Sequence, residues 1–164
     1  MKKMLVIMSA SFALLGCQVA PTVPEKTSLE IQAIQARNFD ADKSTVFKAV
    51  LSVLQDLGYV VSSASLETGF ITAESPTKKD DSGSAVAAAL FGGVRTELKT
   101  AVTASVEDMS VKTTRVRLNF VNKKFRSAQR GQQASDDSPV NDPKIYENAY
   151  EKIGEAVFIR QAQK

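Results

Sequence analysis

The chain has one thiol and no imidazole, which limits the side chains available for catalysis and metal binding. Its 164 residues contain a single cysteine, Cys17, and no histidine. Ser-His-Asp and Cys-His catalysis and the common zinc sites need imidazoles or several thiolates. The side chains left for catalysis are carboxylates, lysines, tyrosines and serines. An enzyme is therefore the least favoured class, and we expect no catalytic residues, no metal site and no cofactor.

The cysteine itself follows an apolar run near the beginning of the sequence. Two lysines precede this run, which covers residues 4–15, and Gly16 stands directly before Cys17. A basic start, a short apolar stretch and small residues before a cut are the parts of a secretory signal peptide. The run is shorter than the roughly 20 residues of a membrane-spanning helix. We therefore expect it to be cleaved and not to remain as a membrane span.

The stretch Leu14-Leu15-Gly16-Cys17 resembles the lipobox of bacterial lipoproteins. The resemblance implies cleavage between Gly16 and Cys17, a diacylglyceryl thioether on the cysteine sulfur and an acylated amino terminus. Two or more acyl chains give stable membrane anchoring. In Gram-negative lipoproteins an aspartate after the cysteine tends to retain the protein in the inner membrane. Gln18 therefore implies an outer-membrane anchor with the domain facing the periplasm. An ordinary secretory signal with a chance cysteine is the alternative.

Composition indicates one small domain behind this signal. Loss of residues 1–16 removes two lysines and no acid, which lowers the formal charge from +3 to +1. Nonspecific nucleic-acid binding rests on many phosphate contacts, so a nearly neutral chain argues against it. We divide the chain into a signal peptide at 1–16, a flexible tether at 17–28 and one α+β domain at 29–162. A tether packed on the domain as an extended strand is the alternative.

An apolar stretch and a basic cluster are the candidate contact sites. Residues 85–94 are small and apolar and end in glycines. Exposed apolar patches usually mark interaction sites, which makes Ala89, Leu90 and Phe91 candidates for contact with a membrane or partner. A short helix packed over a sheet edge is the alternative for this stretch.

The basic cluster stands beside a predicted polar loop at residues 123–141. Its members are Lys123, Lys124 and Arg126, with Arg130 nearby. They are candidates for contact with anionic headgroups or with a partner. A solvated loop is the alternative.

Paired acids and paired tyrosines are weaker signals. Asp80-Asp81 and Asp136-Asp137 supply oxygen ligands suited to calcium, but their spacing fits no EF-hand loop, and turns are favoured. Tyr146 and Tyr150 stand one helical turn apart. They either line a groove against the sheet or pack at the rim of the core.

The elements that must position these residues follow from hydrophobic periodicity. Apolar residues at helical spacing predict helices over residues 43–57 and 143–161. Alternation and β-branched residues predict strands over 29–39, 59–64, 70–74, 96–107 and 113–121, with polar loops at 77–84 and 123–141. The order β-α-β-β-β-β-α predicts an α+β fold, in which an antiparallel sheet of about five strands carries two helices on one face.

This order resembles the helix-grip arrangement. It is similar in outline to domains of the lipoprotein subunit of the outer-membrane barrel-assembly machine. Leu54-Gln55-Asp56-Leu57-Gly58-Tyr59 and residues 146–158 also resemble a family of small, uncharacterised bacterial lipoproteins. These resemblances imply a compartment and no established activity.

The sequence thus favours a noncatalytic, lipid-anchored interaction module in an envelope assembly or secretion complex. Its expected partners are the membrane, through the lipid on Cys17, and an envelope protein. The alternative function is a lipid or small-molecule carrier, which needs a cavity between helices and sheet near Phe47, Tyr146 and Tyr150.

Overall fold

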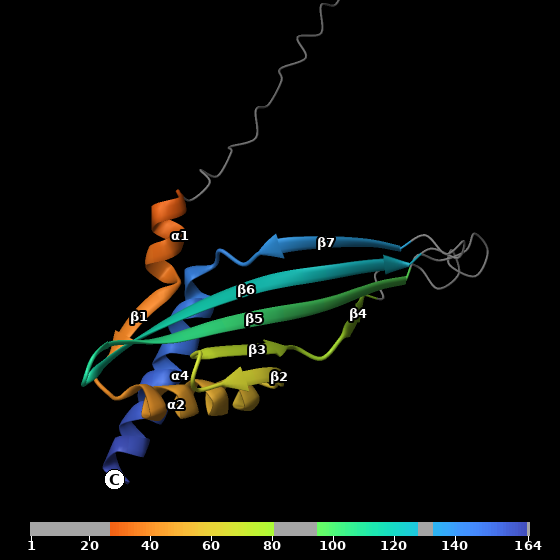
Figure 1. Cartoon of the computed structure of the whole chain (residues 1–164). Helices are drawn as coiled ribbons and strands as arrows, with labels where there is room; N and C mark the ends of the chain where they lie inside the picture. The colour runs from red at the N-terminus through yellow and green to blue at the C-terminus, as the bar shows by residue number, and fades with distance from the viewer. Residues whose placement is uncertain (1–26, 81–94, 128–132, 164) are drawn as a thin grey trace, which may run out of the picture.

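The fold is one antiparallel sheet with helices on one face, seen in a computed structural model that describes residues 27–80, 95–127 and 133–163 (Figure 1). The α+β class is confirmed, and the described residues form a sheet of seven strands where about five were expected. The elements in chain order are α1 (Ser28–Ile34), β1 (Ala36–Phe39), α2 (Lys43–Asp56), β2 (Val60–Ser65), β3 (Phe70–Glu74), β4 (Lys78–Asp80), β5 (Arg95–Ser110), β6 (Thr113–Ser127), β7 (Gln133–Pro139) and α4 (Pro143–Ala162).

Two long central strands organise the sheet. The strand order is β1-β6-β5-β3-β2, and β5 pairs with β6 along their whole length, from Arg95 opposite Ser127 to Ser110 opposite Thr113. Each long strand has two shorter neighbours on its other edge, one after the other. Strand β5 pairs with β3 and then β4, and β6 pairs with β1 and then β7.

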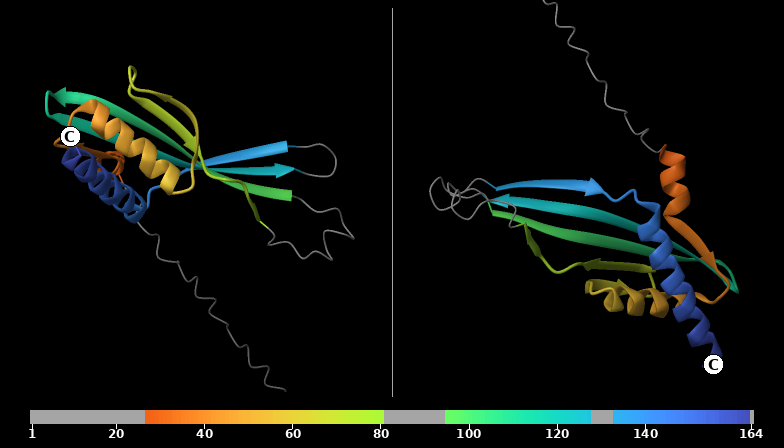
Figure 2. Two further views of the ribbon diagram at one scale, coloured as in Figure 1. Left: turned by 90° about the horizontal axis from the view of Figure 1, so that it is seen from below. Right: turned by 180° about the vertical axis from the view of Figure 1, so that it is seen from behind.

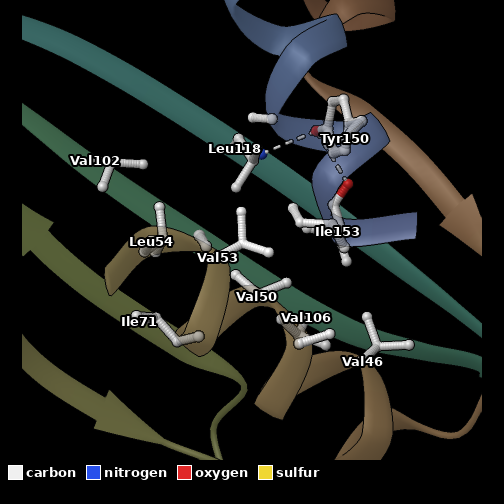
Figure 3. Packing of buried hydrophobic residues seen from close by; sticks show 14 of the residues in the cluster. Val46, Val50, Val53, Leu54, Ile71, Val102, Val106, Leu118, Tyr150 and Ile153 are labelled. Atoms are coloured by element: carbon white, nitrogen blue, oxygen red, sulfur yellow. Dashed lines mark hydrogen bonds between the residues drawn. The ribbon is translucent and has the colours of Figure 1, made fainter. Parts of the chain in front are cut away.

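The helices α2 and α4 lie side by side on the inner face of the sheet (Figure 2). Alternate residues of the central strands point towards them, and these are Val102, Ala104, Val106, Val116, Leu118 and Phe120. The apolar stripe of α2 packs on this layer with Val46, Val50, Val53 and Leu54 (Figure 3). Each such aliphatic side chain contributes about 1.5–3 kcal/mol on burial. The predicted alternation in residues 113–121 is confirmed.

The sheet is longer than the helices that cover it. The pairing of β5 with β6 continues beyond α2, where β4 and β7 flank the two strands (Figure 1). We call β4, β7, residues 95–100 of β5 and residues 122–127 of β6 the sheet extension. Leu98 has the same strand parity as the buried Val102 but is 36% exposed, because no described helix packs on it.

The first predicted strand is wrong over most of its length. Residues 28–34 form α1, and only Ala36–Phe39 form β1. A capping box explains the helix: Thr27 accepts a hydrogen bond from the amide of Glu30, and the Glu30 carboxylate accepts one from the amide of Thr27. This reciprocal pair satisfies amides that the first helical turn leaves without partners.

The two predicted loops are also wrong in part. Strand β6 continues to Ser127, β7 occupies Gln133–Pro139, and β4 occupies Lys78–Asp80. Their sequences are polar on both faces, where no described helix covers the sheet extension, so the hydrophobic alternation that predicts strands is missing. Main-chain hydrogen bonds to the neighbouring long strands hold these segments extended.

No helix within the described ranges is both long enough and apolar enough to cross a membrane.

Two glycines at turns predict a contrast in stability. Gly58 and Gly69 both have positive φ, 83° and 78°, but a Cβ at Gly58 would meet nothing within 4 Å. A Cβ at Gly69 would lie 2.2 Å from the main-chain oxygen of Val106. Gly58→Ala should cost about 1–2 kcal/mol for the left-handed backbone alone. Gly69→Ala should cost roughly 1–3 kcal/mol more, because β5 must move.

The measurement is urea unfolding of the domain followed by circular dichroism, with the Gly58→Ala protein as the matched control. Equal losses in the two variants would mean that the contact with Val106 does not constrain the β2–β3 turn.

Candidate functional site

Several predicted site residues lie outside the described part of the chain. They are Gly16 and Cys17 of the predicted anchor and Ala89, Leu90 and Phe91 of the predicted contact stretch. Their roles stay predictions. The three basic residues Lys123, Lys124 and Arg126 are described, and all three lie in β6, within the range predicted as a loop.

Strand alternation separates this basic cluster into two faces. Lys123 lies on the outer face, where its Nζ is 3.2 Å from Oε1 of Glu74. Lys99 approaches the other carboxylate oxygen of Glu74 at 3.8 Å. Lys124 and Arg126 have the parity of the buried Phe120 and so lie on the inner face. The sequence had treated these residues as one cluster; the structure brings only Lys124 and Arg126 together.

The inner face of the sheet extension forms a groove of about 700 Å³. One end is closed by the residues that follow α2, and one side is closed by the connection between β3 and β4. The floor is the sheet itself. The lining residues are Leu57, Gly58, Tyr59, Ser75, Pro76, Lys78, Leu98, Thr100, Asn122, Lys124, Asp136 and Ser138. Lys99 also borders the groove, although its side chain has the parity of the outer face.

Register places four groove residues in one row across the sheet. Lys78 of β4 pairs with Leu98 of β5, Leu98 pairs with Lys124 of β6, and Lys124 pairs with Asp136 of β7. Directly paired residues share a face, so all four side chains belong to the groove. The row carries two ammonium groups, one carboxylate and one exposed leucine. Arg126 follows two residues along β6 and adds a third cation to this face.

The next row towards the core is polar and uncharged. Thr100 pairs with Asn122, and Asn122 pairs with Ser138. The hydroxyl of Thr100 donates to the side-chain oxygen of Asn122 at 3.0 Å. Ser75 holds the edge of this row, since its amide donates to the oxygen of Thr100 at 2.8 Å and its hydroxyl accepts from the Thr100 amide at 2.9 Å.

Apolar side chains line the end of the groove nearest the helices. Leu57 is 37% exposed there, and Gly58 ends α2 with its positive φ. The ring of Tyr59 is tilted against Phe120, with centroids 6.2 Å apart. Burial raises the pKa of the Tyr59 phenol above its ordinary value of 10.0, so this side chain is neutral at physiological pH. The groove thus combines an apolar end with a cationic floor.

The tyrosine pair belongs to the core and not to this groove. Tyr146 and Tyr150 of α4 are 1% and 2% exposed. The Tyr146 hydroxyl donates to the oxygen of Val140 at 2.8 Å. The Tyr150 hydroxyl donates to the main-chain oxygen of Gln35. It also accepts from the amide of Leu118 at 3.2 Å (Figure 3). The guanidinium carbon of Arg37 lies 5.1 Å from the centre of the Tyr150 ring.

The acidic pairs do not converge on a site. Asp136 and Asp137 are adjacent residues of β7 and face opposite sides of the sheet, so the predicted turn at this pair is wrong. Asp80 ends β4. Within the described ranges, no three carboxylate or thiol side chains come together as metal ligands would.

The groove residues that sequence reasoning missed are those in the sheet extension and at the end of α2. The sequence predicts Leu98 as part of a strand over 96–107, and it predicts a turn at Asp136. A single signal was present: Lys124 and Arg126 continue the two-residue spacing of Val116, Leu118 and Phe120. It was hidden because the inward positions change from apolar to cationic where the helices end.

Comparison with known proteins adds little. No protein-family model matches the chain. No curated protein matches it either. Among solved structures, the chain is similar to a crystal structure of a DUF4468 family protein from Bacteroides ovatus, with 8% sequence identity and a TM-score of 0.39 over 74% of this chain and 84% of that chain.

Burial of Tyr150 predicts a loss of stability at alkaline pH. Desolvation raises its pKa in the folded state well above the ordinary value of 10.0, so the unfolded chain releases this proton first as pH rises. The stabilisation is complete below pH 10 and decreases above it. Tyr150→Phe should lower the free energy of unfolding by about 1–3 kcal/mol near neutral pH, because the Gln35 oxygen loses a donor.

Urea unfolding between pH 8 and pH 11, a range that spans the ordinary tyrosine pKa, measures both effects. The decline above pH 10 should be shallower in Tyr150→Phe than in the unmodified protein, and the part due to Tyr59 should remain. An unchanged decline would show that the Tyr150 hydroxyl ionises without opening the fold.

Proposed function

We propose that this protein is a lipid-anchored, noncatalytic interaction module of the bacterial envelope, and that its described contact surface is the groove of the sheet extension. The observation that carries the proposal is that the sheet continues past α2 and leaves a 700 Å³ concave surface uncovered by any described element. Exposed leucines next to charged side chains on a sheet suit protein contact.

The anchor rests on sequence. A lipid on Cys17 would hold the chain at the outer membrane, and residues 18–26 would separate the lipid from Thr27, where the described fold begins. This arrangement would keep the domain within a short tether of the membrane surface. It would let the groove meet an envelope protein in the periplasm, as a subunit of an assembly or secretion complex.

The carrier hypothesis needs a cavity between the helices and the sheet, and buried side chains fill that space. Phe47, Tyr146 and Tyr150 are all buried where the cavity was expected. The cavity beside the tyrosines measures about 150 Å³, below the 300–1,000 Å³ typical of ligand pockets. The interaction module is therefore the function that the geometry supports best.

Photocrosslinking in cells tests the contact surface. A photoreactive residue in place of Leu98 should form an adduct with one envelope protein, since Leu98 lies in the groove. Phe125 is the matched control, because it is exposed to a similar degree on the outer face of the same sheet extension. Equal adducts from both positions, or a purified domain that stays monomeric with no adduct in cells, would refute the proposal.

Substitution of the cysteine tests the anchor. Cys17→Ser should abolish incorporation of labelled palmitate and move the protein from the membrane fraction to the soluble fraction, because an oxygen cannot form the thioether. Gln18→Ala is the control, since it keeps the sulfur at the same position. Palmitate labelling that persists in Cys17→Ser would rule out the lipobox interpretation.

A further inference from the structure

We infer that the groove binds a partner segment that carries carboxylate side chains beside an apolar residue. This inference rests on the proposed function and names the chemistry of its partner. It depends on how charge and apolar surface are distributed over the inner face of the sheet extension.

Cations are in excess on this face. Lys78, Lys124 and Arg126 share it with two acidic residues, Asp136 and Asp80, the latter placed there by its pairing with Thr96. The close ion pairs among the described residues, between Glu74 and the lysines at 99 and 123, lie on the opposite face. Lys124 stands opposite Asp136 but, within the described ranges, forms no close ion pair with it, so the Lys124 charge faces the groove. An anionic partner would gain association rate and specificity from these cations.

The same face also carries apolar side chains next to the cations. Leu98 stands directly across from Lys124, and Leu57 and Tyr59 close the end of the groove. A segment that places an apolar side chain against these residues would bring a neighbouring carboxylate to Lys124. Three features therefore select the partner: apolar contact at one end, cations along β6, and the uncharged Thr100–Asn122 row between them.

The outer face of the same strands gives the contrast. There the lysines at 99 and 123 are engaged by Glu74, and Asn119 and Arg117 continue the face towards the β5–β6 turn. The covered half of the inner face is filled by α2 and α4. The sheet extension is thus the part of the inner face that is cationic, and the same part is left uncovered by the described helices.

Charge reversal in the crosslinking assay tests the inference. With the photoreactive residue at Leu98, Lys124→Glu together with Arg126→Glu should lower the adduct yield by about tenfold or more, since like charges would face each other. Two controls should keep the yield within about twofold. One is the charge-preserving exchange Lys124→Arg with Arg126→Lys, and the other is Arg117→Glu on the outer face. Thermal unfolding by circular dichroism verifies that each variant is folded.

The crosslinked partner peptide is then sequenced by mass spectrometry. Aspartate or glutamate next to the attachment site, together with the loss on charge reversal, supports the inference. An adduct of undiminished yield in the reversed variant would overturn the inference and leave the proposed function standing. An adduct to lipid, to a second copy of this chain or to residues 81–94 of the same chain would overturn it, and the absence of any adduct would overturn both.

Discussion

The fold depends on how one open edge of β6 is satisfied. Strand β1 pairs with β6 up to Arg117, and β7 begins to pair at Val121, so three residues of β6 lie between the two neighbours. Two main-chain hydrogen bonds satisfy groups in this gap: the amide of Leu118 donates to Gln35, and the amide of Val140 donates to Phe120. The hydroxyls of Tyr150 and Tyr146 on α4 add to these bonds, since they accept from the amides of Leu118 and Phe120 at 3.2 and 3.5 Å. Because buried main-chain groups need partners, the helix cannot leave without exposing this edge.

This attachment explains why the covered and uncovered halves of the sheet differ. The hydrogen bonds hold α4 over the part of β6 between its pairings with β1 and β7. Helix α2 packs beside α4 on the same half of the sheet. Beyond that point the sheet extension is held by main-chain pairing, and no described element places an apolar layer on either face. Such a surface tolerates polar and charged side chains. A binding surface can therefore form there without loss of core packing.

Sequence patterns predicted the covered half well and the extension poorly. The stripe Val46, Val50 and Val53 and the alternation Val116, Leu118 and Phe120 are signatures of burial, and both were interpreted correctly. The residues of β4 and β7 have no such signature: residues 134–139 of β7 are exposed on both faces, and β4 is polar throughout, so the sequence predicts loops there. The helix α1 was missed for a related reason: none of its residues is buried, and a capping box determines its start.

The sequence alone determined the positions of the main helices, the inward face of the central strands, the absence of imidazole chemistry and the expectation of a lipid on Cys17. These features are local, because periodicity, capping and composition act over a few residues. Only the tertiary structure decided that Lys123 and Lys124 face opposite sides, that Lys78 and Asp136 join one row, and that Tyr146 and Tyr150 serve the edge of β6. Such relations depend on strand register between segments distant in the chain, and local patterns carry no information about register when both faces are polar.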